Sequence, residues 1–115
     1  MDLEELAARL RDFAQERDWE QFHSPKNLSM ALSVEVAELL EHFQWLTEEQ
    51  STSLDEEVLA EVSEEIADIQ IYLARLADRL SVDIEKSVTA KIAINAEKYP
   101  ISKAHGKALK STKLK

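Results

Sequence analysis

The stretches Glu35-Val-Ala-Glu38 and Glu65-Ile-Ala-Asp68 each place two carboxylates three residues apart. On a helix this spacing puts both side chains on one face, about one turn apart. Apolar residues surround both pairs with helical periodicity, so Glu35 and Glu65 fall inside the apolar stripes of their helices. The two stretches therefore predict two helices that pack together with carboxylates at their packed faces.

Four crowded carboxylates would repel one another, and an unpaired buried carboxylate is costly or shifts its pKa. A hard divalent cation removes both problems. Ligation by oxygen alone, without His or Cys, favours Mg²⁺, with Mn²⁺ as a substitute. We therefore predict a metal site, which is also the catalytic centre, at Glu35, Glu38, Glu65 and Asp68.

Two other interpretations of the carboxylates remain. A structural ion-pair network would need buried cations, and the nearest arginines of the second stretch, Arg75 and Arg79, lie well beyond Asp68. A ferritin-like di-iron site would need Glu-x-x-His on two helices, whereas Glu38 and Asp68 occupy the positions where His would stand. Both alternatives fit the sequence less well than a magnesium site.

Composition predicts one all-α domain. The 115 residues include one Gly, two Pro and no Cys, so little interrupts helices and no disulfide is available. No apolar run approaches the roughly 20 residues that span a bilayer, and the acidic start does not resemble a signal peptide, so a cytoplasmic protein without a membrane partner is expected. Five of the 14 basic residues lie in 101–115, which leaves 9 basic against 23 acidic residues elsewhere, a balance that disfavours nucleic acid.

Capping residues and periodicity predict a bundle of four helices without strands, over residues 3–17, 25–46, 54–80 and 84–99. The expected N-caps are Asp2, Ser24, Ser53 (in a capping box with Glu56) and Asp83. The third helix would be about 40 Å long, more than one small domain can cover, so part of it should pack on another subunit. Residues 1–100 are predicted to form the helical domain, and residues 101–115 a flexible basic tail.

Aromatic and polar residues near the acidic pairs are candidates for substrate binding. Trp45 follows Glu38 by seven residues, roughly 10 Å along a helix, which is about the distance from a phosphate-bound metal to a nucleotide base. Core packing or a solvated helix face would explain such residues equally well. The full set of candidates is Trp19, His23, Trp45, Tyr72, Lys91, Asn95 and Tyr99.

In order along the chain, several motifs resemble the MazG-type nucleotide pyrophosphohydrolases, and within them the short dCTP pyrophosphatases. The resemblance covers about residues 13–100 and rests on Glu16-Arg-Asp-Trp-Glu-Gln-Phe-His23, Pro25-Lys-Asn-Leu28, Glu35-Val-Ala-Glu38-Leu39, Phe43-Gln-Trp45, Glu65-Ile-Ala-Asp68-Ile-Gln-Ile-Tyr72-Leu73, Lys91-Ile-Ala-Ile-Asn95 and Tyr99-Pro100.

The resemblance implies a helical homo-oligomer, a dimer or a tetramer built as a dimer of dimers. It implies Mg²⁺-dependent hydrolysis of a nucleoside triphosphate to the monophosphate and pyrophosphate, as nucleotide-pool house-cleaning. It also assigns the base pocket to Trp19, His23, Trp45 and Tyr72, and the phosphate contacts to Lys91, Asn95 and Tyr99. One position departs from the family pattern: Val34 stands where the wider family has a further Glu, which leaves the number of metal ions open.

A non-enzymatic helical interaction module, such as an antitoxin-like partner of a basic protein, is the alternative of another class, and a structural oligomerisation bundle is a third. Both predict no metal dependence, and neither explains why Glu35 and Glu65 stand in apolar stripes. The sequence therefore favours the enzyme.

Overall fold

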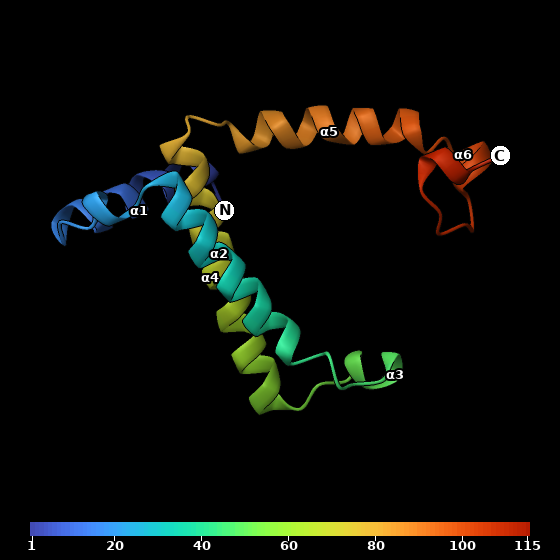
Figure 1. The fold of residues 1–115 in the computed structure, drawn as a ribbon, viewed down its shortest axis with the longest axis horizontal. Coiled ribbons are helices and arrows are strands. Elements are labelled where there is room, and N and C mark those ends of the chain that lie inside the picture. Colours follow the sequence, from blue (N-terminus) through green and yellow to red (C-terminus); the bar gives the residue numbers. More distant parts are fainter. The chain divides into compact units, whose positions relative to one another are not determined.

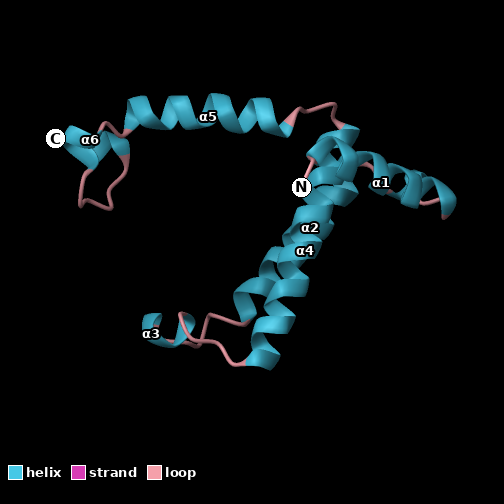
Figure 2. Cartoon of the chain, turned by 180° about the vertical axis from the view of Figure 1, so that it is seen from behind, coloured by secondary structure: helices cyan, strands magenta, loops and turns pink.

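Helices make up all the regular secondary structure, as Figure 2 shows for the computed structural model, which describes all 115 residues. This confirms the prediction of an all-α protein. Two compact units, Met1–Val82 and Asp83–Lys115, divide the chain, and each is described by itself. In chain order the elements are α1 (Leu3–Glu16), the 3₁₀ turn η1 (Glu20–Phe22), α2 (Pro25–Glu41), α3 (Glu48–Ser51), α4 (Glu56–Arg79), α5 (Ile84–Lys98), α6 (Ile101–Ala104) and the 3₁₀ turn η2 (Ser111–Lys113).

The first unit is built on an antiparallel pair of helices, α2 and α4, which run side by side in Figure 1. Helix α1 packs on α4 as well. The apolar side chains that this packing buries are few and mostly small: Ala14, Leu28, Val62, Ala74 and Ala77. The acidic pairs predicted from the sequence therefore lie on the two helices that pack most extensively on each other.

Three of the four predicted N-caps are confirmed, since the side chains of Asp2, Ser24 and Asp83 each accept a hydrogen bond from a backbone N–H in the first turn. The fourth prediction was wrong. Asp55, rather than Ser53, caps α4, because its carboxylate accepts from the Val58 N–H at 2.9 Å. At 24 residues and 1.5 Å per residue, α4 is about 36 Å long.

Helix α2 is shorter than predicted, because it ends at Glu41 rather than near Leu46. After Glu41 the backbone bonds tighten to the three-residue spacing, with the Phe43 N–H donating to the Leu40 carbonyl at 2.9 Å. The apolar pattern continues past this point, and the sequence prediction followed it too far. The polar stretch after Leu46 also contains a short helix that was not predicted, α3, which begins at a capping box between Thr47 and Gln50.

Helices α1 and α4 end in the same backbone motif. After α1, Asp18 takes a left-handed conformation (φ 54°), its N–H donates to the Gln15 carbonyl, and the Trp19 N–H donates to the Ala14 carbonyl. After α4, Ser81 has φ 56°, its N–H donates to the Asp78 carbonyl, and the Val82 N–H donates to the Ala77 carbonyl. Both are Schellman motifs with a residue other than glycine at the left-handed position.

The second unit contains α5, α6 and η2. The predicted stop of α5 before Pro100 is confirmed, since the helix ends at Lys98. The segment predicted as a flexible tail includes two short helical turns, and the Ser111 N–H donates to the Tyr99 hydroxyl at 3.3 Å. No helix in either unit combines the length and apolar character of a membrane-spanning segment.

Candidate active site

The four predicted carboxylates are distributed over the two packed helices, with Glu35 and Glu38 on α2 and Glu65 and Asp68 on α4. Their proximity shows in the pKa of Glu35. Burial raises this pKa, and so do the nearby carboxylate of Glu38 and the charges of Asp68 and Glu65. The structure thus brings all four groups into one electrostatic cluster, as the helical spacing predicted.

Two oxygens of this cluster are buried without a hydrogen-bond partner, Glu35 Oε2 and Glu65 Oε2. A carboxylate oxygen that loses water and gains no donor is destabilising, so native proteins keep such atoms rare. Glu38, by contrast, is exposed. The cluster therefore has an inner part with two oxygens that make no hydrogen bond, and an outer carboxylate, Glu38, that is exposed to water.

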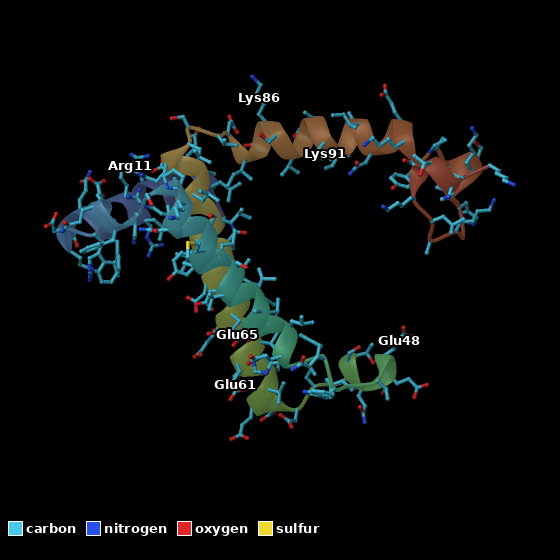
Figure 3. All side chains as sticks on the ribbon, viewed as in Figure 1. Arg11, Glu48, Glu61, Glu65, Lys86 and Lys91 are labelled. Carbon is cyan, nitrogen blue, oxygen red and sulfur yellow. The ribbon has the colours of Figure 1, made fainter.

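His42, which the sequence analysis did not single out, lies beside the cluster. Its Nε2 is 2.7 Å from Glu65 Oε2 and its Nδ1 is 3.7 Å from Glu61 Oε2. The two glutamates project from α4 as labelled in Figure 3. Although His42 Nε2 lies this close, Glu65 Oε2 has no hydrogen bond. His42 follows Glu38 by four residues, a spacing that could have revealed it.

His42 is the basic side chain that lies closest to Glu65 and Glu61 in the ion-pair interpretation. It does not satisfy Glu35, whose buried oxygen has no partner. No three His, Cys, Asp or Glu side chains are arranged to hold a metal ion as they stand. The donor set of four carboxylates with two orphan oxygens nevertheless fits the oxygen-only ligation of Mg²⁺ or Mn²⁺, so those two ions stay a prediction.

Trp19 and His23, two of the predicted base-pocket residues, lie together in the connection between α1 and α2. Their ring centroids are 6.2 Å apart, and Phe13 contacts Trp19 edge to face with centroids at 5.8 Å. Phe13 was not a predicted site residue, although it lies on the apolar face of α1, six residues before Trp19. Trp19 keeps 43% of its surface exposed, which leaves ring area for a ligand.

His23 also contacts Arg75, a residue of α4 that is 3% exposed. The Arg75 Nε donates to His23 Nδ1 at 3.3 Å. Burial lowers the pKa of His23, and the positive charges of Arg75 and Arg79 lower it further, while Glu20 opposes them. From the sequence, Arg75 was a candidate only as a cation for the carboxylates; in the structure it contacts His23 of the predicted base pocket instead.

The other two predicted pocket residues, Trp45 and Tyr72, make no aromatic contact with Trp19. Tyr72 is half-buried on α4. Trp45 is 86% exposed and lies beyond the end of α2, so the expectation that it continues the helical stripe of Glu38 was wrong. Its exposure suits either a ligand or a partner surface.

The predicted phosphate contacts Lys91, Asn95 and Tyr99 belong to the second unit, where all three are exposed. The four-residue spacings put them on one face of α5 and its C-cap. Because the two units are described separately, the grouping of these residues with the carboxylates stays a prediction.

Known proteins resemble this chain over most of its length. The MazG-like family model matches residues 30–114. The dCTP pyrophosphatase 1 of Mus musculus is 43% identical over 114 residues, covering 97% of this chain and 67% of the relative. The Homo sapiens protein of the same name is 44% identical over 116 residues, with 97% and 67% covered. The crystal structure of a pyrophosphatase from Archaeoglobus fulgidus matches with a TM-score of 0.79 at 44% identity, over 84% of this chain and 91% of that one.

The helices and the cluster define an all-α protein whose acidic site lies between two packed helices. With the comparisons, the class is that of the nucleotide pyrophosphohydrolases, and the enzyme favoured by the sequence is confirmed over the interaction module. The chain belongs to the MazG-like family. This confirms the resemblance found in its motifs.

Proposed function

We propose that the enzyme cleaves dCTP, or dCTP with a substituent on cytosine C5, to the monophosphate and pyrophosphate in the presence of Mg²⁺, in the cytoplasm and as part of nucleotide-pool house-cleaning. The observation that carries the chemistry is the pair of buried oxygens of Glu35 and Glu65 that make no hydrogen bond inside a carboxylate cluster. The names of the relatives, dCTP pyrophosphatase 1, support the choice of nucleotide.

The carboxylates of Glu35, Glu38, Glu65 and Asp68 would hold the Mg²⁺. When bound, the ion would neutralise charge on the triphosphate and on the pyrophosphate that leaves. Glu38, the exposed member, is the candidate to accept the proton of the water that attacks the α-phosphorus. The family resemblance assigns contacts with phosphate oxygens to Lys91, Asn95 and Tyr99 of the second unit, whose side chains carry N–H and O–H donors.

The base would stack on Trp19 or Trp45. Stacking contributes about 1 to 3 kcal/mol per base and hardly discriminates, because every base has a π-face. Selection therefore falls to polar groups at the edge of the ring, and His23 is the side chain beside Trp19 that can supply one. An aromatic wall that fits closely around the base would exclude purines by size.

Hydrolysis should occur between the α and β phosphates and should require the metal. The measurement is product analysis of each canonical triphosphate and of 5-methyl-dCTP, with Mg²⁺ and with EDTA, and with a pyrophosphatase added to convert pyrophosphate to phosphate. We expect monophosphate and pyrophosphate with Mg²⁺ and no turnover in EDTA. A nucleoside diphosphate as product, or an undiminished rate in EDTA, would refute the proposed chemistry.

Base choice should depend on the aromatic residues. dCTP or 5-methyl-dCTP should have the highest kcat/KM. The change Trp45→Ala should raise KM by about tenfold or more, because about 1 to 3 kcal/mol of stacking is lost, and His23→Ala should reduce the preference for cytosine more than it reduces kcat. Equal cleavage of purine triphosphates by the unaltered protein, or an unchanged KM in Trp45→Ala, would show that the pocket is elsewhere.

The protein should be a homo-oligomer, a dimer or a tetramer. Along the packed pair, large apolar side chains such as Leu40, Leu59 and Ile66 are more than half exposed, with 59%, 52% and 54% of their surface free. Large apolar side chains exposed to this extent are often covered at an interface between subunits. Light scattering at micromolar concentration should give a multiple of 13.1 kDa; a monomer would contradict the prediction.

A further inference from the structure

The contact between Arg75 and His23 determines which nitrogen of the imidazole carries the proton. An arginine stays protonated in proteins, so its Nε is always a donor. Because Nε of Arg75 donates to His23 Nδ1 at 3.3 Å, that nitrogen must be the acceptor and carry no proton. In a neutral imidazole the proton is then on Nε2, which becomes the donor.

Arg75 is held in place by groups from three elements. Its Nη1 donates to Asp78 Oδ2 at 3.2 Å on α4, and Glu20 Oε1 of η1 is 3.7 Å from its Nη2. Asp78 in turn accepts two bonds from Arg11 of α1, at 2.7 and 3.2 Å. This arrangement, which we call the Arg75 network, fixes the planar guanidinium so that Nε faces His23.

The charges around His23 favour the neutral ring. Burial and the positive charges of Arg75 and Arg79 all lower its pKa, and Glu20 acts in the opposite direction without reversing the shift. A neutral ring with one defined donor can select between bases, whereas a protonated ring would donate from both nitrogens.

We propose that Arg75 is a positioning residue for base selection, which holds His23 in the tautomer whose Nε2–H donates to the edge of cytosine. This rests on the proposed function. Cytosine offers acceptors at O2 and N3, while uracil and thymine carry a proton on N3. A fixed donor facing N3 therefore accepts cytosine and opposes a donor in the other two pyrimidines, a mismatch that leaves polar groups unpaired.

The first test needs no substitution and no substrate. Long-range ¹H–¹⁵N correlation spectra of the full-length protein labelled at histidine report which ring nitrogen of His23 is protonated, with His23→Gln used to assign the signals. We expect the proton on Nε2 near neutral pH. A proton on Nδ1, or on both nitrogens, would overturn the proposal.

The second test compares Arg75→Met with Arg79→Met. Arg79 lies one turn further along α4 and adds charge near His23 without donating to it, so it is the matched control. We expect Arg75→Met to give mixed tautomers and to lower the ratio of kcat/KM for dCTP over dUTP about tenfold, roughly the loss of one buried hydrogen bond. Arg79→Met should change neither.

If Arg75→Met does not fold, Arg75→Lys keeps the charge but loses the planar Nε donor, and it should show the same two changes. An unchanged tautomer, or an unchanged ratio in a folded Arg75 variant, would overturn the proposal. Failure of the unaltered enzyme to cleave dCTP would instead refute the proposed function, and the tautomer would still be decided by the spectra.

Discussion

Neutralising either Asp68 or Glu38, as Asp68→Asn or Glu38→Gln, should lower turnover by about 100-fold or more, because each removes a charged oxygen ligand from the predicted metal site. Helix content by circular dichroism should stay unchanged. The control is Glu41→Gln, which neutralises an exposed carboxylate one turn beyond Glu38 at the end of α2. Its steady-state kcat should stay close to that of the unaltered protein.

The same two variants should be as stable as the unaltered protein without metal, or more stable. The charges of Glu38 and Asp68 raise the pKa of Glu35, so removing either one relieves repulsion in the cluster. Thermal unfolding in EDTA measures this. A large loss of stability in EDTA would contradict the prediction and favour a structural ion-pair network around His42.

Leu28→Ala should destabilise the protein by about 2 to 5 kcal/mol, because it removes a buried side chain and leaves a cavity. Leu28 is 2% exposed and is the largest side chain that is fully buried. It lies on α2, whose packing on α4 holds the two carboxylate pairs together. Urea unfolding at one fixed protein concentration measures the loss, since an oligomer's stability depends on concentration.

Met30→Ala is the control for Leu28→Ala. Met30 stands two residues further along α2 and is 58% exposed, so its truncation should cost far less. Equal losses in both variants would mean that α2 is held by an interface that covers Met30, rather than by the interior of one chain.

Local sequence signals predicted most of the helices. Asp2, Ser24 and Asp83 cap as expected because a short acceptor side chain before a helical pattern leaves few other outcomes. Ser53 failed because Asp55 competes for the same role two residues later and its carboxylate is a charged acceptor close to the first turn. The end of α2 was missed because periodicity of apolar residues does not distinguish an α-helix from the tighter turns that follow it.

The carboxylate cluster could be predicted because each pair is local in sequence and both lie in apolar stripes. The contact of Arg75 with His23 could not, since the two residues are 52 positions apart and meet only through the packing of the α1–α2 connection on α4. The four-residue spacing from Glu38 could have placed His42 near the cluster. Its contacts with Glu61 and Glu65 could not be predicted, because those residues lie on another helix.

Asp18, which immediately precedes Trp19 and has a left-handed backbone conformation, would not be improved much by a change to glycine. Glycine would relieve a steric cost of about 1 to 2 kcal/mol there, but it would also give the unfolded chain more freedom, which costs about 0.5 to 1 kcal/mol. The Asp18 carboxylate moreover accepts from Gln21 Nε2 at 3.0 Å, a bond that glycine would lose. Having Asp18 instead of glycine at this turn therefore costs little net stability. The backbone there is also stiffer than glycine would make it, which limits the directions in which the Trp19 side chain can point.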